Sequence, residues 1–176
     1  MKRRIVMVTG APAAGKSTLA GPLALELGFP LLSKDHIKET LHDCLGSLDG
    51  AALAASGRLG AATMELIWAL AARCPAAVIE ANFLPRHPET RPRLAALAAD
   101  VVEVYCHCPL PEAARRFTAR AADSGHHPVH IRSLPEHVLA EYDRPLEVGP
   151  VNRVDTTRPS DLAVLGADVR RAFTAG

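Results

Sequence analysis

Short apolar runs rich in β-prone residues alternate along the chain with longer stretches whose apolar residues have helical spacing. The five β-prone runs cover residues 4–8, 29–32, 76–80, 101–106 and 151–155. The helical stretches cover residues 16–27, 35–45, 51–73, 88–99, 110–123, 134–143 and 159–173. This alternation predicts an α/β fold, a parallel five-stranded sheet with helices on both faces. Ligands of such sheets bind beyond the carboxyl ends of the strands, so the residues that end each strand are the first candidates for function.

A glycine-rich loop follows the first expected strand. The stretch Gly10-Ala-Pro-Ala-Ala-Gly-Lys-Ser17 matches the pattern G-x-x-x-x-G-K-[ST] in full, between a strand and a helix. Backbone N–H groups and the helix dipole favour phosphate there, so the loop is expected to bind a nucleoside triphosphate. Lys16 is expected to reach the β- and γ-phosphates, and the Ser17 hydroxyl to ligate Mg²⁺. The expected nucleotide-binding residues are Gly10, Ala11, Pro12, Ala13, Ala14, Gly15, Lys16, Ser17 and Thr18.

Composition narrows the class of protein. A chain of 176 residues, 48% hydrophobic and 22% charged, is expected to form one domain over residues 1–176. A net charge of +1 gives no strong field, so neither nucleic acid nor a membrane surface is expected as the main partner. The basic start at residues 1–4 leads into a strand rather than a secretion signal, and no apolar run is long enough to span a bilayer. An ATP-dependent protein with four scattered cysteines is expected to be cytoplasmic, with reduced thiols.

The segment after the second expected strand carries a candidate catalytic carboxylate. Asp35 follows Ser33 at the start of a helix, on the same sheet edge as the glycine loop. A carboxylate there is suited to bind an acceptor hydroxyl and to take its proton as the hydroxyl attacks the γ-phosphate. The alternative is an acidic residue placed for the helix dipole, with Ser33 as the N-cap. Position alone does not decide between the two interpretations.

Polar residues also end the third expected strand. Glu80 is the acidic residue best placed to lie near Mg²⁺, and a strand-end glutamate paired with an arginine is the alternative. Asn82 is expected to hydrogen-bond a substrate hydroxyl, and Arg86 is a further candidate for substrate binding.

Two arginines lie on one face of the helix expected at 110–123. Arg116 and Arg120 are four residues apart, which places their guanidinium groups side by side. They are suited to clamp the transferring phosphoryl group. A solvated helix face is the alternative.

A polar, turn-rich stretch over 124–130 follows this helix and is not expected in the core. Residues 116–135 are therefore expected to form a lid. The stretch contains His126, His127 and His130, which lack a carboxylate or cysteine to complete a metal site and are expected to face substrate or solvent. The run Cys106-His-Cys108 has no second pair at zinc-site spacing and is interpreted as buried strand thiols.

Taken together, these segments resemble the small phosphate-loop kinases. The resemblance is strongest to the short phosphotransferases grouped as AAA-family ATPases, which are related to chloramphenicol phosphotransferases, zeta-toxin kinases and the kinase domain of polynucleotide kinase. The segments that carry it are 10–18, 32–39, 78–83 and 116–120, leading to Arg132. It implies a nucleotide-kinase-like sheet with a small lid, ATP and Mg²⁺ as cofactors, Asp35 as the general base, and contacts from Arg116 and Arg120 to the triphosphate. Many relatives carry Asp-Gly where this chain has Glu80-Ala81.

Three functional hypotheses follow from the sequence. The first is a kinase that transfers the γ-phosphate of ATP to a hydroxyl of a small metabolite, sugar or antibiotic, with Asp35 as base. The second is a nucleoside, nucleotide or 5′-hydroxyl nucleic-acid kinase, although a polynucleotide substrate usually requires a basic groove. The third is an ATP-binding switch without a small acceptor. Residues 155–159 are a candidate segment for contacting the adenine base.

Overall fold

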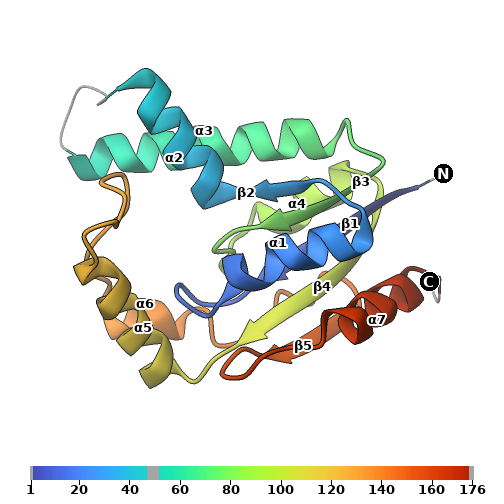
Figure 1. Cartoon of the computed structure of the whole chain (residues 1–176). Helices are drawn as coiled ribbons and strands as arrows, with labels where there is room; N and C mark the ends of the chain where they lie inside the picture. Colours follow the sequence, from blue (N-terminus) through green and yellow to red (C-terminus); the bar gives the residue numbers. More distant parts are fainter. Residues whose placement is uncertain (1, 47–51, 175–176) are drawn as a thin grey trace.

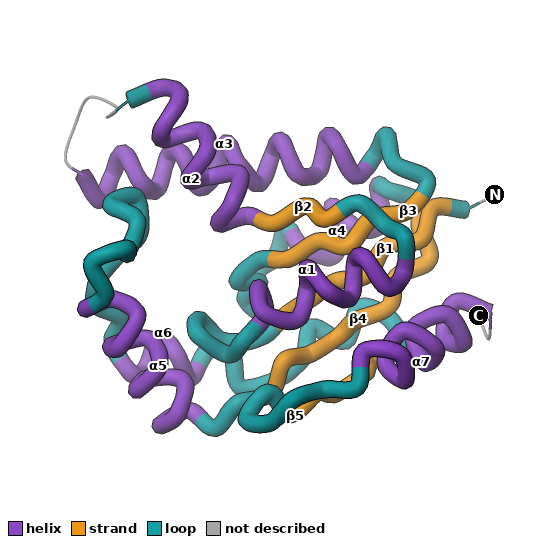
Figure 2. Tube along the Cα trace, viewed as in Figure 1, coloured by secondary structure: helices purple, strands orange, loops and turns teal. Residues whose placement is uncertain are grey.

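The computed structural model describes residues 2–46 and 52–174. Within them, five parallel strands form one sheet in the order β2-β3-β1-β4-β5 (Figure 2). The strands are β1 (Arg3–Thr9), β2 (Leu31–Ser33), β3 (Ala76–Glu80), β4 (Ala99–His107) and β5 (Val151–Asp155). This sheet confirms the fold class expected from the sequence.

Helices cover both faces of the sheet (Figure 1). They are α1 (Lys16–Leu27), α2 (Lys34–Leu45), α3 (Ala52–Ala71), α4 (Thr90–Ala96), α5 (Leu110–Ala122), α6 (Glu136–Ala140) and α7 (Leu162–Thr174). Successive side chains of β1 point to opposite faces, so Val6 and Val8 pack with α1 and α7, whereas Ile5 and Met7 pack with α3 and α4. No helix of the described residues combines the length and apolar character needed to cross a membrane.

Element boundaries differ from the expected ones mainly at the short elements. The second strand covers 31–33 rather than 29–32, and α4 covers 90–96 rather than 88–99. β4 is longer than expected because Ala99 and Asp100 pair with Arg3 and Arg4 of β1, a register that the local sequence does not reveal. The helix expected from residue 51 is described from Ala52, and residue 51 lies outside the described residues.

The connection between α5 and α6, residues 123–135, is called the α5–α6 segment. It folds back to α2 and α3 (Figure 2). The Val129 carbonyl oxygen accepts a hydrogen bond from the Ser56 hydroxyl at 2.8 Å, and His130 Nε2 lies 2.7 Å from Glu39 Oε1. As a result Val129 and His126 are only 5% and 9% exposed. The expectation that this stretch stays out of the core is therefore wrong for these two residues, because tertiary contacts bury them.

A buried glutamate joins the sheet to the chain that follows α6. The side chain of Glu103 on β4 is fully buried and accepts three hydrogen bonds. Their donors are the Thr9 hydroxyl at 2.6 Å and the backbone N–H groups of Leu146 and Glu147, both at 2.8 Å.

We expect the Glu103→Ala substitution to lower the free energy of unfolding by about 4 kcal/mol, because three donors lose their acceptor in the interior. Equilibrium denaturation in urea measures this change. Glu65→Ala, which removes an exposed ion pair with Arg93, is the control and should cost less than about 1 kcal/mol. A comparably small loss for Glu103→Ala would contradict the role assigned to Glu103.

Candidate active site

The loop between β1 and α1 has a conformation that depends on two glycines. Gly10 has φ +132° and Gly15 has φ +83°, values that side chains disfavour. A Cβ atom on Gly10 would also lie 2.5 Å from the carbonyl oxygen of Cys106 on β4. The first glycine of the motif therefore allows both the turn and the close approach to β4.

Lys16 is buried inside this loop. Its ammonium donates a hydrogen bond to the Ala11 carbonyl oxygen at 2.7 Å, and the residue is 5% exposed. Burial lowers the pKa of Lys16, and attraction to the Glu80 carboxylate opposes that shift. The ammonium thus lies at the loop, where it is available to a phosphate bound by the loop N–H groups.

Glu80 ends β3 beside the start of α1. It accepts a hydrogen bond from the Ser33 hydroxyl at 2.7 Å and a longer one, 3.3 Å, from the Ser17 hydroxyl. Burial raises the pKa of Glu80, and attraction to Lys16 partly offsets the shift. Ser33 occupies the N-cap position of α2, but its hydroxyl donates to Glu80 rather than capping the helix.

A central cavity of about 220 Å³ lies between the glycine loop, α2, the end of β3 and α5. It brings together candidate residues from segments far apart in the sequence. They are Lys16, Ser17, Asp35, Glu80, Asn82, Arg116 and Arg120. From the glycine loop, Pro12, Ala13, Gly15 and Thr18 also line it. Arg86 is exposed on the turn after β3 and is not among the lining residues.

The two arginines of α5 are held differently. Arg116 donates to Glu112 Oε1 at 2.7 Å and to the carbonyl oxygen of Thr156 at 3.3 Å. The Arg120 guanidinium lies 5.6 Å from the centroid of the Phe117 ring. Arg116 is therefore fixed between α5 and the loop after β5, and Arg120 is placed through a contact within its own helix.

Two further cavities adjoin the central cavity through shared lining residues. The β5 cavity, about 240 Å³, includes Gly15, Thr18 and Arg116 together with Thr156 and residues 158–160. The Thr156 hydroxyl lies 2.7 Å from the Ala14 carbonyl oxygen, which holds this loop against the glycine loop. On the other side, the α2 cavity, about 390 Å³, shares Ser17, Asp35 and Arg120 with the central cavity. Its wall also includes Glu39 and the α5–α6 segment.

A fourth cavity lies between α3 and the chain after β3. This aromatic cavity, about 370 Å³, is lined by Met64, Trp68 and Phe83, and it shares Asn82 with the central cavity. The Trp68 and Phe83 ring centroids are 6.0 Å apart. The Trp68 side chain thus forms part of a pocket wall, but Asp35 does not line this cavity.

One expectation about the histidines is corrected by the structure. No carboxylate was expected to complete a metal site with His126, His127 and His130, yet Asp43 Oδ1 of α2 lies 3.1 Å from His127 Nε2. The carboxylate is far away in sequence, so the spacing of the motif cannot reveal it. The contact of the α5–α6 segment with α2 brings it there.

Comparisons with known proteins agree with this architecture. A family model described as an AAA domain matches residues 5–147. A comparison with curated proteins gave no match. The crystal structure of a candidate kinase from Chloroflexus aurantiacus J-10-fl has a TM-score of 0.84 and 29% identity, covering 98% of this chain and 99% of that chain.

More distant structures share the fold alone. A gluconokinase from Sinorhizobium meliloti 1021 is 17% identical with a TM-score of 0.56, over 99% of this chain and 92% of its own. Kti12 from Chaetomium thermophilum, solved with ADP-AlF3, is 20% identical with a TM-score of 0.57, over 97% of this chain and 96% of its own.

Proposed function

The chain belongs to the AAA domain family, among the small P-loop kinases, and on that premise we propose that it transfers the γ-phosphate of ATP to a hydroxyl group of a small molecule. One observation carries the proposal. The Asp35 carboxylate lines the same cavity as Lys16 and Ser17 of the glycine loop. A candidate base and a phosphate-binding loop therefore share one space, as in-line phosphoryl transfer requires.

The nucleotide site is proposed around the glycine loop. The loop N–H groups and Lys16 hold the phosphates, and the adenine base occupies the β5 cavity beside Thr156 and residues 158–160. Ser17 and Glu80 offer a hydroxyl and a carboxylate, hard oxygen ligands that fit Mg²⁺, directly or through water. When bound, Mg²⁺ neutralises charge on the β- and γ-phosphates. Use of ATP makes the cytoplasm the expected location.

Asp35 is proposed as the general base. It takes the proton of the acceptor hydroxyl while the acceptor oxygen bonds to the γ-phosphorus and the bond from that phosphorus to the β–γ bridging oxygen breaks, releasing ADP. Lys16, Arg116 and Arg120 stabilise the charge that spreads over the γ-phosphate oxygens. Asn82 is proposed to hydrogen-bond the acceptor from the end of β3.

The acceptor is proposed to enter through the α2 cavity, because Asp35 lines that cavity and not the aromatic one. The α5–α6 segment forms its outer wall, consistent with a lid role for residues 116–135. His126 lines it as well, and the buried Nε2 of this residue has no hydrogen-bond partner among the described residues. An acceptor hydroxyl is proposed to supply that partner.

The charges around the α2 cavity favour one class of acceptor. Among the residues that the structure describes, no apolar side chain lines it, and three carboxylates do: Asp35, Glu39 and Asp123. The Arg120 guanidinium, the one guanidinium among these described residues, also faces the central cavity. An acceptor with a carboxylate or phosphate would face like charges there. We therefore favour an uncharged or amino-bearing compound rich in hydroxyl groups, and we disfavour nucleotides and nucleic-acid ends.

An acceptor panel tests this proposal by measuring ADP release. We expect uncharged sugars, polyols or amino alcohols to stimulate ADP release at least about tenfold over the basal rate. Matched pairs such as glucitol and gluconate test the charge argument, and the uncharged member should react faster. If no acceptor is phosphorylated and a protein partner binds only in the ATP state, the chain is a switch and the kinase proposal fails.

A further inference from the structure

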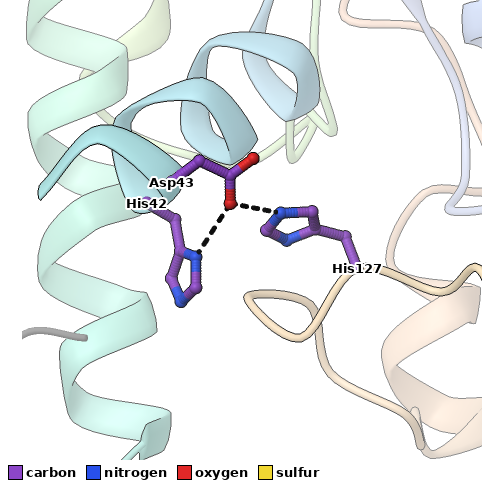
Figure 3. Close-up of side chains that lie close together, drawn as sticks. All are labelled: His42, Asp43 and His127. Carbon is purple, nitrogen blue, oxygen red and sulfur yellow. Dashed lines mark hydrogen bonds and ion pairs between the residues drawn. The ribbon is translucent and has the colours of Figure 1, made fainter. Parts of the chain in front are cut away.

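Three side chains with metal-binding atoms meet where α2 touches the α5–α6 segment (Figure 3). His42 and Asp43 come from the last turn of α2, and His127 comes from the α5–α6 segment. Asp43 Oδ1 lies 3.4 Å from His42 Nδ1 and 3.1 Å from His127 Nε2. All three atoms lie within 4.8 Å of one another, and no other such group occurs in the part of the chain that the structure describes.

The spacing of these atoms fits a tetrahedral ion. Bonds of about 2.0–2.1 Å to zinc place neighbouring ligand atoms about 3.3 Å apart, close to the two separations at Asp43. Two imidazole nitrogens and one carboxylate oxygen suit a divalent transition metal rather than Mg²⁺ or Ca²⁺. The Asp43 side chain is 67% exposed, which leaves room for water as the fourth ligand. Hydrogen bonds from His127 and His42 hold the pKa of the Asp43 carboxyl below its usual range.

The second nitrogen of His127 provides a marker for metal binding. Its Nδ1 accepts a hydrogen bond from the Val129 backbone N–H at 3.2 Å, which places the proton of a neutral ring on Nε2. A metal bound at Nε2 needs the lone pair of that nitrogen, so the ring proton must move from Nε2 to Nδ1. The Val129 N–H then loses its acceptor. Binding therefore replaces the hydrogen bonds of His127 to Asp43 and Val129 by a metal–nitrogen bond, and it changes the environment of the Val129 amide.

We propose that His42, Asp43 and His127 bind a divalent transition-metal ion such as Zn²⁺, and that the ion fastens the α5–α6 segment to α2. The site is separate from the residues proposed for Mg²⁺, Ser17 and Glu80, and does not depend on the proposed kinase activity. Binding of the ion affects the position of the α5–α6 segment. Both elements that the ion joins line the α2 cavity, so a bound ion keeps the outer wall of that cavity in place.

Zinc titration of the full 176-residue chain, without an affinity tag, tests the site. The titration is followed by calorimetry with excess Mg²⁺ present. We expect one saturable site whose affinity falls at least about tenfold in each of H42A, D43N and H127A, with the fold checked by circular dichroism. His137→Ala, on the exposed face of α6, is the matched control and should bind Zn²⁺ as the unmodified chain does. The amide resonance of Val129 should shift on binding.

Several results would overturn the proposal. One is no saturable binding up to about 100 μM Zn²⁺. Another is affinity that survives any one of the three substitutions, because the site needs all three ligands. The fastening role has its own readout, since Zn²⁺ should slow amide hydrogen exchange over residues 123–130 in the unmodified chain and not in H127A. Binding with unchanged exchange in that segment would refute the fastening role.

Discussion

Replacing Asp35 with asparagine is expected to lower phosphoryl transfer at saturating substrates by at least about 100-fold and to leave ATP affinity nearly unchanged. Asparagine keeps the size and the hydrogen-bonding oxygen of the side chain but cannot take up the acceptor proton. Asp35 is in the first turn of α2 and lines the central cavity together with residues of the glycine loop. Single-turnover transfer from labelled ATP and equilibrium ATP binding measure the two quantities separately.

Glu39→Gln is the matched comparison for Asp35→Asn. Glu39 lies one turn further along α2 and lines the α2 cavity, but not the central cavity. Loss of the Glu39 charge is expected to raise the KM of the acceptor, while the transfer rate at saturation changes by less than about tenfold. Equal losses of rate in the two variants, or an unchanged rate in Asp35→Asn, would remove Asp35 as the base.

Lys16→Met is expected to reduce transfer by at least about 100-fold, because the only ammonium among the described residues that line the central cavity is lost. Methionine retains most of the length of the side chain without its charge. Burial disfavours the charged form of Lys16, which is why its pKa is lowered. The substitution should therefore leave the free energy of unfolding unchanged or raise it, although transfer falls.

Lys2→Met provides the control for this experiment, since Lys2 pairs with Asp100 at the exposed start of the chain. It should alter neither transfer nor stability measurably. If Lys16→Met unfolds the protein, or retains the full transfer rate, Lys16 does not have the assigned role at the phosphates.

The glycine loop and the residues at the strand ends could be predicted from the sequence. The glycine loop could be placed between β1 and α1 because its motif encodes both the turn and the helix start, and α1 begins at Lys16 as expected. The gathering of Asp35 and Glu80 at one edge followed from parallel strands, since Ser33 of β2 is in register with Glu80 of β3. Ligands of parallel sheets bind beyond the carboxyl ends of the strands, so the residues at those ends could be identified as candidates from the sequence.

Contacts between distant segments could not be predicted in the same way. The hydroxyl of Ser33 was a candidate N-cap, but the nearby Glu80 carboxylate takes its hydrogen bond instead. Asp43 contacts His127 because the α5–α6 segment folds back to α2. That segment has no apolar periodicity from which its position could be predicted. The Thr156 contact with the glycine loop depends equally on tertiary packing, although the turn residues at 155–159 had marked that loop as a candidate for the adenine site.

The proposed reaction requires that Asp35 take a proton from an acceptor hydroxyl beside the glycine loop. The most direct measurement is a crystal structure with Mg²⁺, ADP, aluminium fluoride and an acceptor identified by the panel. We expect the acceptor in the α2 cavity, with its reacting oxygen within about 3.2 Å of the Asp35 carboxylate and in line with the leaving oxygen of ADP. An acceptor bound in the aromatic cavity, with Asp35 turned to solvent, would contradict this expectation.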